Sequence, residues 1–433
     1  MSGPSNAGTR LDPWFGSYAA RTHGMKASET RALFAVANRP EVVSLAGGMP
    51  FIDALPLEII AKVTADLIAT DGAVALQYGS GQGHPVLREH ITTVMAEEGI
   101  SAHPDDVVVT TGSQQALDLV TRIFIDPGDV IVAEAPSYVG ALSVFHAYEA
   151  DVVHVAMDAD GLVPQALRET LGRCRREGRR VKFLYTVPTF HNPAGVSLSE
   201  PRRMEILEIC REAGVLVVED NPYGMLAFDG TVMPALRSHG EDGVLYLGTF
   251  SKTLAPGYRT GWVAAPHAVR EKLVLASESA ILCPSHASQL AISAYLETCD
   301  WRGQIAEYRK VYKERCEAMV SALAEYLPEC SWNVPRGGFY TWVRLPDGID
   351  ARTMLPRATT ALVAYVSGSA FYADGQGSDH MRLSFCYPTP ARIREGVRRL
   401  SGVVHKELTL VEMFGPQGGP DQDDVESPAP DLA

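Results

Sequence analysis

The chain has 433 residues, of which 46% are hydrophobic, so it is long enough for one large domain or two domains with a substantial core. Its formal net charge of -14, from 52 acidic and 38 basic residues, argues against a nucleic-acid partner, because surfaces that bind nucleic acid are basic. The seven cysteines are scattered without a CxxC pair or a metal-ligand spacing, which favours a reduced cytoplasmic protein with no metal site.

Both ends of the chain differ in composition from its interior. Residues 1–12 are small and polar, have no apolar signal-peptide core, and are expected to be disordered. Residues 411–433 are rich in Gly, Pro and Asp and are expected to form a disordered acidic tail. No apolar run approaches the length of a membrane span, so we expect no membrane contact.

Between residues 45 and 300, short apolar runs rich in β-branched residues alternate with helical stretches. Turn residues bound each run, and this arrangement is typical of a mostly parallel sheet buried on both faces. This region is therefore predicted to be the large domain of an α/β protein. The predicted strands are residues 107–109, 130–132, 152–155, 182–185, 215–218 and 244–247.

One helix of this region can be delimited from its end signals. Ser199 is the predicted N-cap, Pro201 lies in the first turn, and Gly214 ends the helix. Its apolar positions are expected to face inward. Cys210 is one of them, so it is predicted to be a core residue rather than a reactive one.

The pattern changes near residue 300. A long amphipathic helix is predicted over residues 301–327, followed by strand-like pieces near 339–343, 362–366 and 381–385. This order predicts a smaller α+β domain over residues 301–410. Residues 13–44 are expected to form an N-terminal arm that packs with it.

In open α/β sheets, ligands bind beyond the carboxyl ends of the strands, and four predicted strand ends carry chemically useful side chains. The run 107–109 leads through Thr110, Thr111 and Gly112 into a helix start at Ser113. Free backbone N–H groups and the helix dipole would make this turn an anion site. An ordinary strand–helix turn is the alternative interpretation.

Two further strand ends carry polar side chains. Asn192 stands before a proline, which normally marks a turn, but its amide could also donate to a ring oxygen. Asp220 closes a buried strand, where an unpaired carboxylate is expensive, and a pyridinium N–H would be a suitable partner. Tyr223 could then reach a ring hydroxyl. Capping of the following turn is the alternative role for Asp220.

The fourth strand end carries Lys252, between two hydroxyl residues and seven positions before Arg259. A lysine among cationic and apolar neighbours loses proton affinity and can act as an amine nucleophile. Hydroxyl groups and an arginine nearby suit a bound phosphate. A phosphate and a Schiff-base lysine together indicate pyridoxal 5'-phosphate. A solvated lysine on a surface loop is the alternative for Lys252 taken alone.

With these features in order, the chain resembles the fold-type I, class I/II pyridoxal phosphate-dependent aminotransferases, in the branch of the α-aminoadipate and kynurenine aminotransferases. The resemblance covers residues 17–404 and implies a large domain with a mostly parallel seven-stranded sheet, a smaller α+β domain and a homodimer with shared active sites. It rests on Ser44-Leu-Ala-Gly-Gly-Met-Pro50, Gln77-Tyr-Gly79 with Gly83 and Arg88-Glu89, Thr111-Gly-Ser-Gln-Gln115, Asn192-Pro193, Asp220-Asn-Pro-Tyr223, Ser251-Lys252, Arg259 and Arg382.

The resemblance also implies roles for single residues. Lys252 would form the Schiff base and then move the proton between the substrate Cα and the cofactor. Asp220 would pair with the pyridine nitrogen, and Asn192 and Tyr223 would bind the ring hydroxyl. The predicted catalytic residues are thus Lys252, Asp220 and Tyr223.

The remaining implied contacts surround this group. Tyr138 would stack on the pyridine ring, and Tyr78 would reach the phosphate of the neighbouring subunit's cofactor. The phosphate itself would be held by Ser113, Gln114, Ser251 and Arg259.

On the substrate side, Arg382 would grip the α-carboxylate in a bidentate pair. Asn192 would also contact the substrate, and Gly47 and Gly48 would leave room for it. A surface arginine and a structural aromatic are the alternative interpretations of Arg382 and Tyr138.

Two departures from the family pattern concern specificity. Relatives commonly have glutamine before the Asn-Pro pair, where this chain has His191, which either contacts the ligand or packs in its loop. An arginine in the N-terminal arm, which some relatives use to bind a distal carboxylate, falls on or near Gly24, with Arg21 offset. Glutamate and aminoadipate are therefore not the expected favoured substrates.

Three functions are compatible with parts of this pattern. The first is an aminotransferase that moves the amino group of an L-amino acid to a 2-oxo acid. The second is a β- or γ-elimination or replacement enzyme with the same cofactor, for example one acting on S-adenosylmethionine. The third is a transcriptional regulator with an aminotransferase-like domain, which is disfavoured because only about 40 residues precede Ser44, without a helix-turn-helix pattern or basic cluster.

Overall fold

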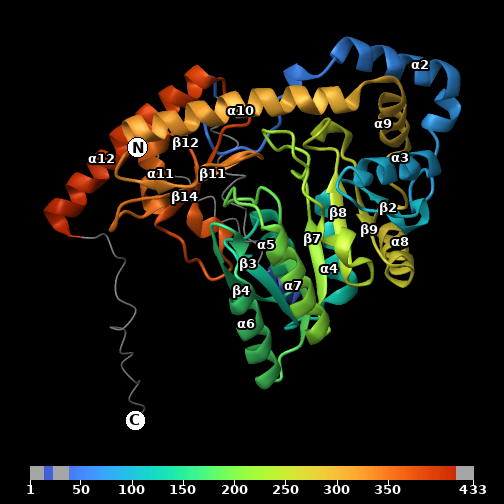
Figure 1. The fold of residues 1–433 in the computed structure, drawn as a ribbon, viewed down its shortest axis with the longest axis horizontal. Coiled ribbons are helices and arrows are strands. Elements are labelled where there is room, and N and C mark those ends of the chain that lie inside the picture. The colour runs from blue at the N-terminus through green and yellow to red at the C-terminus, as the bar shows by residue number, and fades with distance from the viewer. Residues whose placement is uncertain (1–13, 23–38, 416–433) are drawn as a thin grey trace.

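The computed structural model describes residues 14–22 and 39–415, which form a large and a small domain (Figure 1). The large domain is built on a sheet of eight strands in the order β2-β9-β8-β7-β6-β3-β4-β5. Its strands are β2 (Val107–Thr110), β3 (Val130–Ala135), β4 (Asp151–Asp158), β5 (Gly161–Leu162), β6 (Val181–Thr186), β7 (Leu216–Asp220), β8 (Val244–Thr249) and β9 (Gly261–Ala264).

The sheet is mostly parallel, as predicted, since β4, β3, β6, β7 and β8 pair in parallel. The strand β9 is antiparallel to both of its neighbours. The predicted number of seven strands is one too low, because the chain turns back after β4 and adds the two-residue β5 at the edge.

Helices cover both faces of this sheet, and alternate strand residues divide between them. On β3, Ile131 and Ala133 pack with the helices over residues 113–124, 139–147 and 267–281, whereas Val130 and Val132 pack with those over 164–176 and 200–213. This period of two is expected of a strand buried on both sides. The helices of the large domain are α2 (Leu57–Ala75), α3 (Pro85–Ala96), α4 (Ser113–Phe124), α5 (Val139–Ala147), α6 (Pro164–Arg176), α7 (Glu200–Ala213), α8 (His267–Ile281) and α9 (His286–Thr298).

The helix α7 has the predicted ends. Ser199 occupies the N-cap position, although its side chain makes no capping hydrogen bond. Gly214 closes the helix in the left-handed conformation at φ 67°, which glycine adopts without steric cost. Cys210 is 1% exposed, so the prediction of a core cysteine is confirmed.

The small domain contains a four-stranded sheet in the order β10-β11-β14-β13. Its elements are α10 (Trp301–Tyr326), β10 (Ser331–Trp332), β11 (Tyr340–Arg344), α11 (Ala351–Thr360), β12 (Val363–Ala364), β13 (Val366–Ser367), β14 (His380–Ser384) and α12 (Pro390–Phe414). Figure 1 shows α10 reaching from the side of α9 to α12 in the small domain.

The strand β1 (Val43–Ser44) pairs in parallel with β12, so a segment that precedes the large domain in the sequence packs in the small domain. Two predicted boundaries need correction. The single strand predicted over 362–366 is divided into β12 and β13, with Tyr365 between them buried and bonded to Ala351 O through its hydroxyl (2.6 Å). The tail predicted from residue 411 begins too early, because Val411 packs against the core and α12 continues to Phe414.

Other sequence predictions fall beyond the described ranges. Residues 1–12, Gly24 and most of the predicted tail lie outside them. Within residues 14–22 and 39–415, no helix is long and apolar enough to cross a membrane. The same residues hold no cluster of three or more His, Cys, Asp or Glu side chains arranged for a metal ion.

Candidate active site

A cavity of about 600 Å³ lies where the carboxyl ends of the parallel strands meet the small domain. It collects side chains that are far apart in the sequence, because the ends of several strands and two strands of the small domain meet there. The predicted residues that line it are Gly48, Ser113, Gln114, Tyr138, Asn192, Asp220, Tyr223, Ser251, Lys252, Arg259 and Arg382.

One end of the cavity is built to hold an anion. Ser113 and Gln114 are the first residues of α4, whose unpaired N–H groups and dipole favour negative charge there. Gly112 precedes them at φ 79°, and a Cβ at this position would lie 2.6 Å from Nη2 of Arg259. The glycine therefore allows the guanidinium to lie against the turn. Thr249 and Ser251 also line the cavity, and their hydroxyls are 3.0 Å apart.

Lys252 follows β8 and reaches into the middle of the cavity. Its Nζ donates a hydrogen bond of 2.9 Å to the carbonyl oxygen of Gly48, and the ammonium lies 5.7 Å from the centre of the Phe339 ring. Burial, together with the positive charges of Arg382 and Arg259, lowers the pKa of the Lys252 amine to about 8. The lowered pKa makes the unprotonated, nucleophilic form of this amine far more abundant near neutral pH than it is for an ordinary lysine.

Asp220, the last residue of β7, is 4% exposed. Its Oδ2 accepts a hydrogen bond of 2.8 Å from the hydroxyl of Tyr185, while Oδ1 has no hydrogen-bond partner in the described structure. Burial raises the pKa of the Asp220 carboxyl to about 7, against the opposing effect of the Tyr185 hydroxyl. A buried acceptor without a donor is costly, so Oδ1 marks a place for a ligand N–H.

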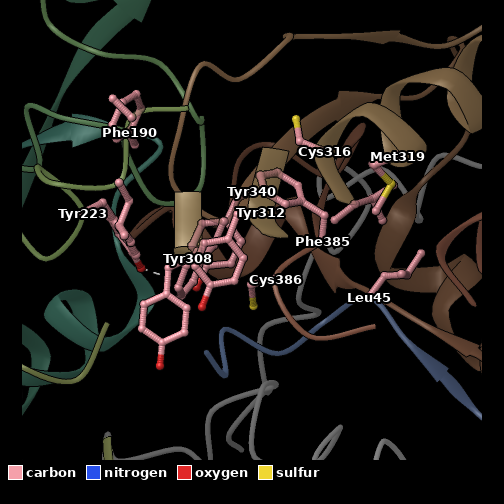
Figure 2. Close-up of a cluster of buried hydrophobic side chains, with 14 of the residues drawn as sticks. Leu45, Phe190, Tyr223, Tyr308, Tyr312, Cys316, Met319, Tyr340, Phe385 and Cys386 are labelled. Carbon is pink, nitrogen blue, oxygen red and sulfur yellow. Dashed lines mark hydrogen bonds between the residues drawn. The ribbon is translucent and has the colours of Figure 1, made fainter. Parts of the chain in front are cut away.

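Two tyrosines close the cavity from opposite domains. The hydroxyl of Tyr223, after β7, donates to that of Tyr340 on β11 at 3.5 Å, and their rings are perpendicular with centres 6.0 Å apart. Figure 2 shows this pair within the buried aromatic cluster. A Cβ at Gly48 would overlap the Tyr340 hydroxyl, so that residue must be a glycine for Tyr340 to lie where it does. Tyr138 donates to Oε1 of Gln114 at 3.3 Å.

Arg382 on β14 is held from several sides. Its Nη1 donates to Oδ1 of Asn192 (2.8 Å) and its Nη2 to the carbonyl of Ala46 (2.6 Å), while Nε has no partner in the described structure. The guanidinium lies 4.2 Å from the Tyr340 ring centre and 5.0 Å from that of Phe371. A planar cation so oriented can bind a carboxylate that enters the cavity.

Other predicted residues lie away from the cavity. Tyr78 is 76% exposed and does not line the cavity of its own chain. Gly47 does not line the cavity, and Arg21 is exposed in the short helix at Ala20–Thr22. His191 is 1% exposed and packs within its loop, so it is not a lining residue.

Sequence reasoning missed two site residues, Tyr185 and Tyr340. Tyr185 lies within a predicted strand, and its alternation with Leu184 would have placed it on the face opposite that residue. Nothing in the sequence pairs it with Asp220. For Tyr340 the sequence predicts only a strand position, because its place in the site depends on how the small domain packs on the large one.

Comparisons with known proteins identify the family of the chain. Residues 40–400 match the family model described as aminotransferase class I and II. The chain is 42% identical to aromatic-amino-acid aminotransferase 1 of Thermococcus litoralis, over 90% of this chain and 94% of the relative. It is 37% identical to 2-aminoadipate transaminase of Thermus thermophilus, over 92% of this chain and 98% of the relative.

A solved aminotransferase structure has a similar fold. The crystal structure of Pyrococcus horikoshii kynurenine aminotransferase in complex with PMP superposes with a TM-score of 0.86 at 41% identity. The superposition covers 90% of this chain and 97% of that one.

Proposed function

The chain belongs to the class I and II aminotransferases, and on that premise we propose that its amino donors are L-amino acids with aromatic or other apolar side chains. It is an aminotransferase that depends on pyridoxal 5'-phosphate and moves an amino group from an amino acid to a 2-oxo acid. The names of these relatives give no support to elimination or replacement as its main reaction.

The residues of the cavity fit the cofactor. The anion cradle at Gly112 suits its phosphate, and the unpartnered Oδ1 of Asp220 suits its ring nitrogen. When bound, pyridoxal phosphate supplies an aldehyde for amines and a protonated ring that takes up the electrons left at the substrate Cα.

The roles proposed for the binding residues follow from where their polar atoms lie. Asp220 would hold the ring nitrogen protonated, and Asn192 would turn its amide nitrogen to the ring hydroxyl, because its Oδ1 already accepts from Arg382. Tyr223 would donate to the same hydroxyl, and Tyr138 would cover one face of the ring. The phosphate would be held by Ser113, Gln114, Ser251 and Arg259.

Lys252 would attach the cofactor and then carry the proton that leaves the substrate Cα, because its amine has a lowered pKa and, among the described residues, forms no ion pair with a carboxylate. The free Nε side of Arg382 would bind the substrate α-carboxylate. Gly48, which a side chain would block, would leave room beside Tyr340.

The proposed substrate class rests on the number of cationic side chains that line the cavity. Three cationic residues line it, and the proposed roles of Lys252, Arg259 and Arg382 employ all three. Within residues 14–22 and 39–415, no fourth cation lines the cavity to meet a second carboxylate. Its other lining residues are largely apolar: Met49, Pro50, Val139, Val187, Pro222 and Pro256.

The substrate class can be tested by measuring kcat/KM for L-phenylalanine, L-tyrosine, L-leucine, L-glutamate and L-2-aminoadipate, with the 2-oxo products identified by mass spectrometry. We expect aromatic donors to exceed the two dicarboxylates by about tenfold or more, equivalent to about 1.4 kcal/mol. A preference for glutamate or 2-aminoadipate would contradict the proposal. Lys252→Ala serves as the inactive control, and S-adenosylmethionine tests for fragment release with the cofactor unchanged.

We further propose a homodimer in which Tyr78 completes the partner's site. The segment around Tyr78 lies on the junction of α8 and α9, where Gln77 O and Nδ1 of His286 are 3.2 Å apart. This face exposes apolar side chains that a second copy would cover. They are Leu76, Tyr78, Ile281 and Leu282.

Mixing two inactive or weakened variants tests the shared site. Dimers that combine a Lys252→Ala chain with a Tyr78→Ala chain contain one site with both residues intact, so the mixture should recover activity. No recovery on subunit exchange, or a monomer by light scattering, would contradict this arrangement. The seven cysteines are all unpaired, which supports a proposed cytoplasmic, reducing location.

A further inference from the structure

His191 is buried next to Asn192 but does not face the cavity, so the proposed reaction does not use it directly. Its ring nonetheless has a polar neighbour at each nitrogen, a hydrogen-bond donor at Nδ1 and a carboxylate at Nε2. Nδ1 accepts a hydrogen bond of 3.2 Å from the backbone N–H of Ala194, so the proton of the neutral ring must reside on Nε2. That nitrogen lies 3.1 Å from Oε2 of Glu134.

Glu134 lies near the end of β3 and is 1% exposed. Its Oε1 accepts from the hydroxyl of Thr186 (2.7 Å) and its Oε2 from the backbone N–H of Val187 (2.8 Å). The N–H of His191 is less well aligned than these two donors, so its contact with Oε2 is mainly electrostatic. A buried carboxylate needs such donors, because leaving it unpaired is costly.

These contacts bind the loop that carries Asn192 to a neighbouring strand. Thr186 and Val187 are where the chain leaves β6, whereas His191 lies in the middle of the loop, so Glu134 holds the loop at both places. From the other side, the buried Arg203 donates to Pro188 O (3.0 Å) and Leu198 O (3.1 Å), which fixes the two ends of the loop.

Asn192 transmits the position of this loop to both ligands. Its Oδ1 accepts from Arg382 at 2.8 Å, which leaves its amide nitrogen for the cavity. A shift of the loop would therefore displace one group proposed to bind the cofactor and, through it, one proposed to bind the substrate. Small displacements of binding groups cost large factors in rate and affinity.

We propose that His191 is a positioning residue for transamination, which holds Asn192, and through it Arg382, in place by bracing the loop against Glu134. This inference rests on the roles proposed above for Asn192 and Arg382.

Three replacements separate the two contacts of the ring. Glutamine can place its amide nitrogen where Nε2 of His191 lies, asparagine can place its oxygen where Nδ1 lies, and leucine can do neither. We expect His191→Leu and His191→Asn to weaken cofactor binding to the apoprotein, followed by absorbance titration, by about tenfold. They should raise the KM for the amino donor by a similar factor. His191→Gln should stay within about twofold of the natural protein in both measurements.

Thr186→Val is the matched control for stability alone. It removes a side-chain donor from the same carboxylate without touching the ring of His191, so it should lower the melting temperature while cofactor affinity and KM stay within about twofold. If Thr186→Val weakens cofactor binding and raises the KM as much as His191→Leu does, both effects come from disturbing the Glu134 carboxylate and not from His191. That result would overturn the proposal.

A double-mutant cycle supplies the decisive comparison. In an Asn192→Ala background, His191→Leu should have little further effect on cofactor affinity, because the group that it positions is gone. Full additivity, or identical behaviour of all three His191 variants and the natural protein, would overturn the proposal alone. An Asn192→Ala protein with unchanged affinities would overturn the proposed role of Asn192 and this inference together.

Discussion

Removal of the Tyr185 hydroxyl tests how the protein prepares Asp220 for its ligand. Tyr185→Phe deletes one oxygen atom, which donates to Oδ2 of Asp220 at 2.8 Å. The ring itself should stay in place, because it is fully buried and packs edge-on against Phe145 with ring centres 5.4 Å apart. The substitution therefore acts on the charge of Asp220 more than on packing.

The size of the effect follows from the strength of the lost bond. A hydrogen bond to a charged group contributes about 1.5–3 kcal/mol, and each 1.4 kcal/mol corresponds to a factor of ten. Burial already raises the pKa of Asp220 to about 7, and loss of the hydroxyl raises it further, since the Tyr185 hydrogen bond favours the ionised form. At pH 7 the variant should bind pyridoxal phosphate about ten- to a hundredfold more weakly.

The dependence on pH distinguishes this explanation from general damage. At low pH the free variant holds a protonated Asp220 that must ionise on binding, whereas at higher pH the carboxylate is ionised in both proteins before binding. The difference in pyridoxal phosphate affinity between Tyr185→Phe and the natural protein should therefore decrease as the pH rises from 7 to 9. Absorbance titration of the apoprotein measures it directly.

Tyr365→Phe is a suitable control, because that hydroxyl is also buried but donates to Ala351 O in the small domain (2.6 Å). It should cost stability without changing cofactor affinity. Equal losses in the two variants, or a Tyr185→Phe deficit that is constant with pH, would refute the reasoning.

Three further predictions concern the cavity. Gly48→Ala should lower kcat/KM by about tenfold or more, because the added Cβ would overlap the Tyr340 hydroxyl. Adding Tyr340→Phe should restore much of the loss, since the Cζ atom of the ring lies 3.2 Å from that Cβ. A double variant no better than Gly48→Ala would contradict this explanation. Gly112→Ala should weaken cofactor binding by about tenfold, from strain at φ 79° and contact with Arg259, and unchanged binding in an absorbance titration would argue against the anion cradle. The rate at which apoprotein takes up pyridoxal phosphate should rise with pH around 8, since the lowered pKa of Lys252 leaves its amine unprotonated above that value; a rise only near pH 10 would exclude the lowered pKa.

The sequence predicted the strands and many cavity residues correctly where both can be recognised from neighbouring residues along the chain. Strands such as 130–132 were predictable because β-branched runs buried on both faces have few polar positions. Asp220 and Lys252 were predictable as cavity residues because they lie at the end of such a strand or a few residues beyond it. These inferences need only neighbours along the chain.

Contacts between distant segments could not be predicted in the same way. The strand β9 was missed because its four residues begin with glycine and pair antiparallel inside a parallel sheet. The bond between Tyr185 and Asp220 depends on the register of β6 against β7. The position of the Arg382 guanidinium depends on three separate segments, since it contacts Asn192, Ala46 and Tyr340.

The pairing of β1 with β12 also has a consequence for how a growing polypeptide becomes an enzyme. During synthesis, the strands up to β8 and Lys252 leave the ribosome well before β12 and β14. The strand β1 therefore remains unpaired while the whole large domain is translated. The residues proposed to hold pyridoxal phosphate emerge first and Arg382 emerges near the end, so a nascent chain acquires its means of keeping the cofactor before its means of recognising an amino acid.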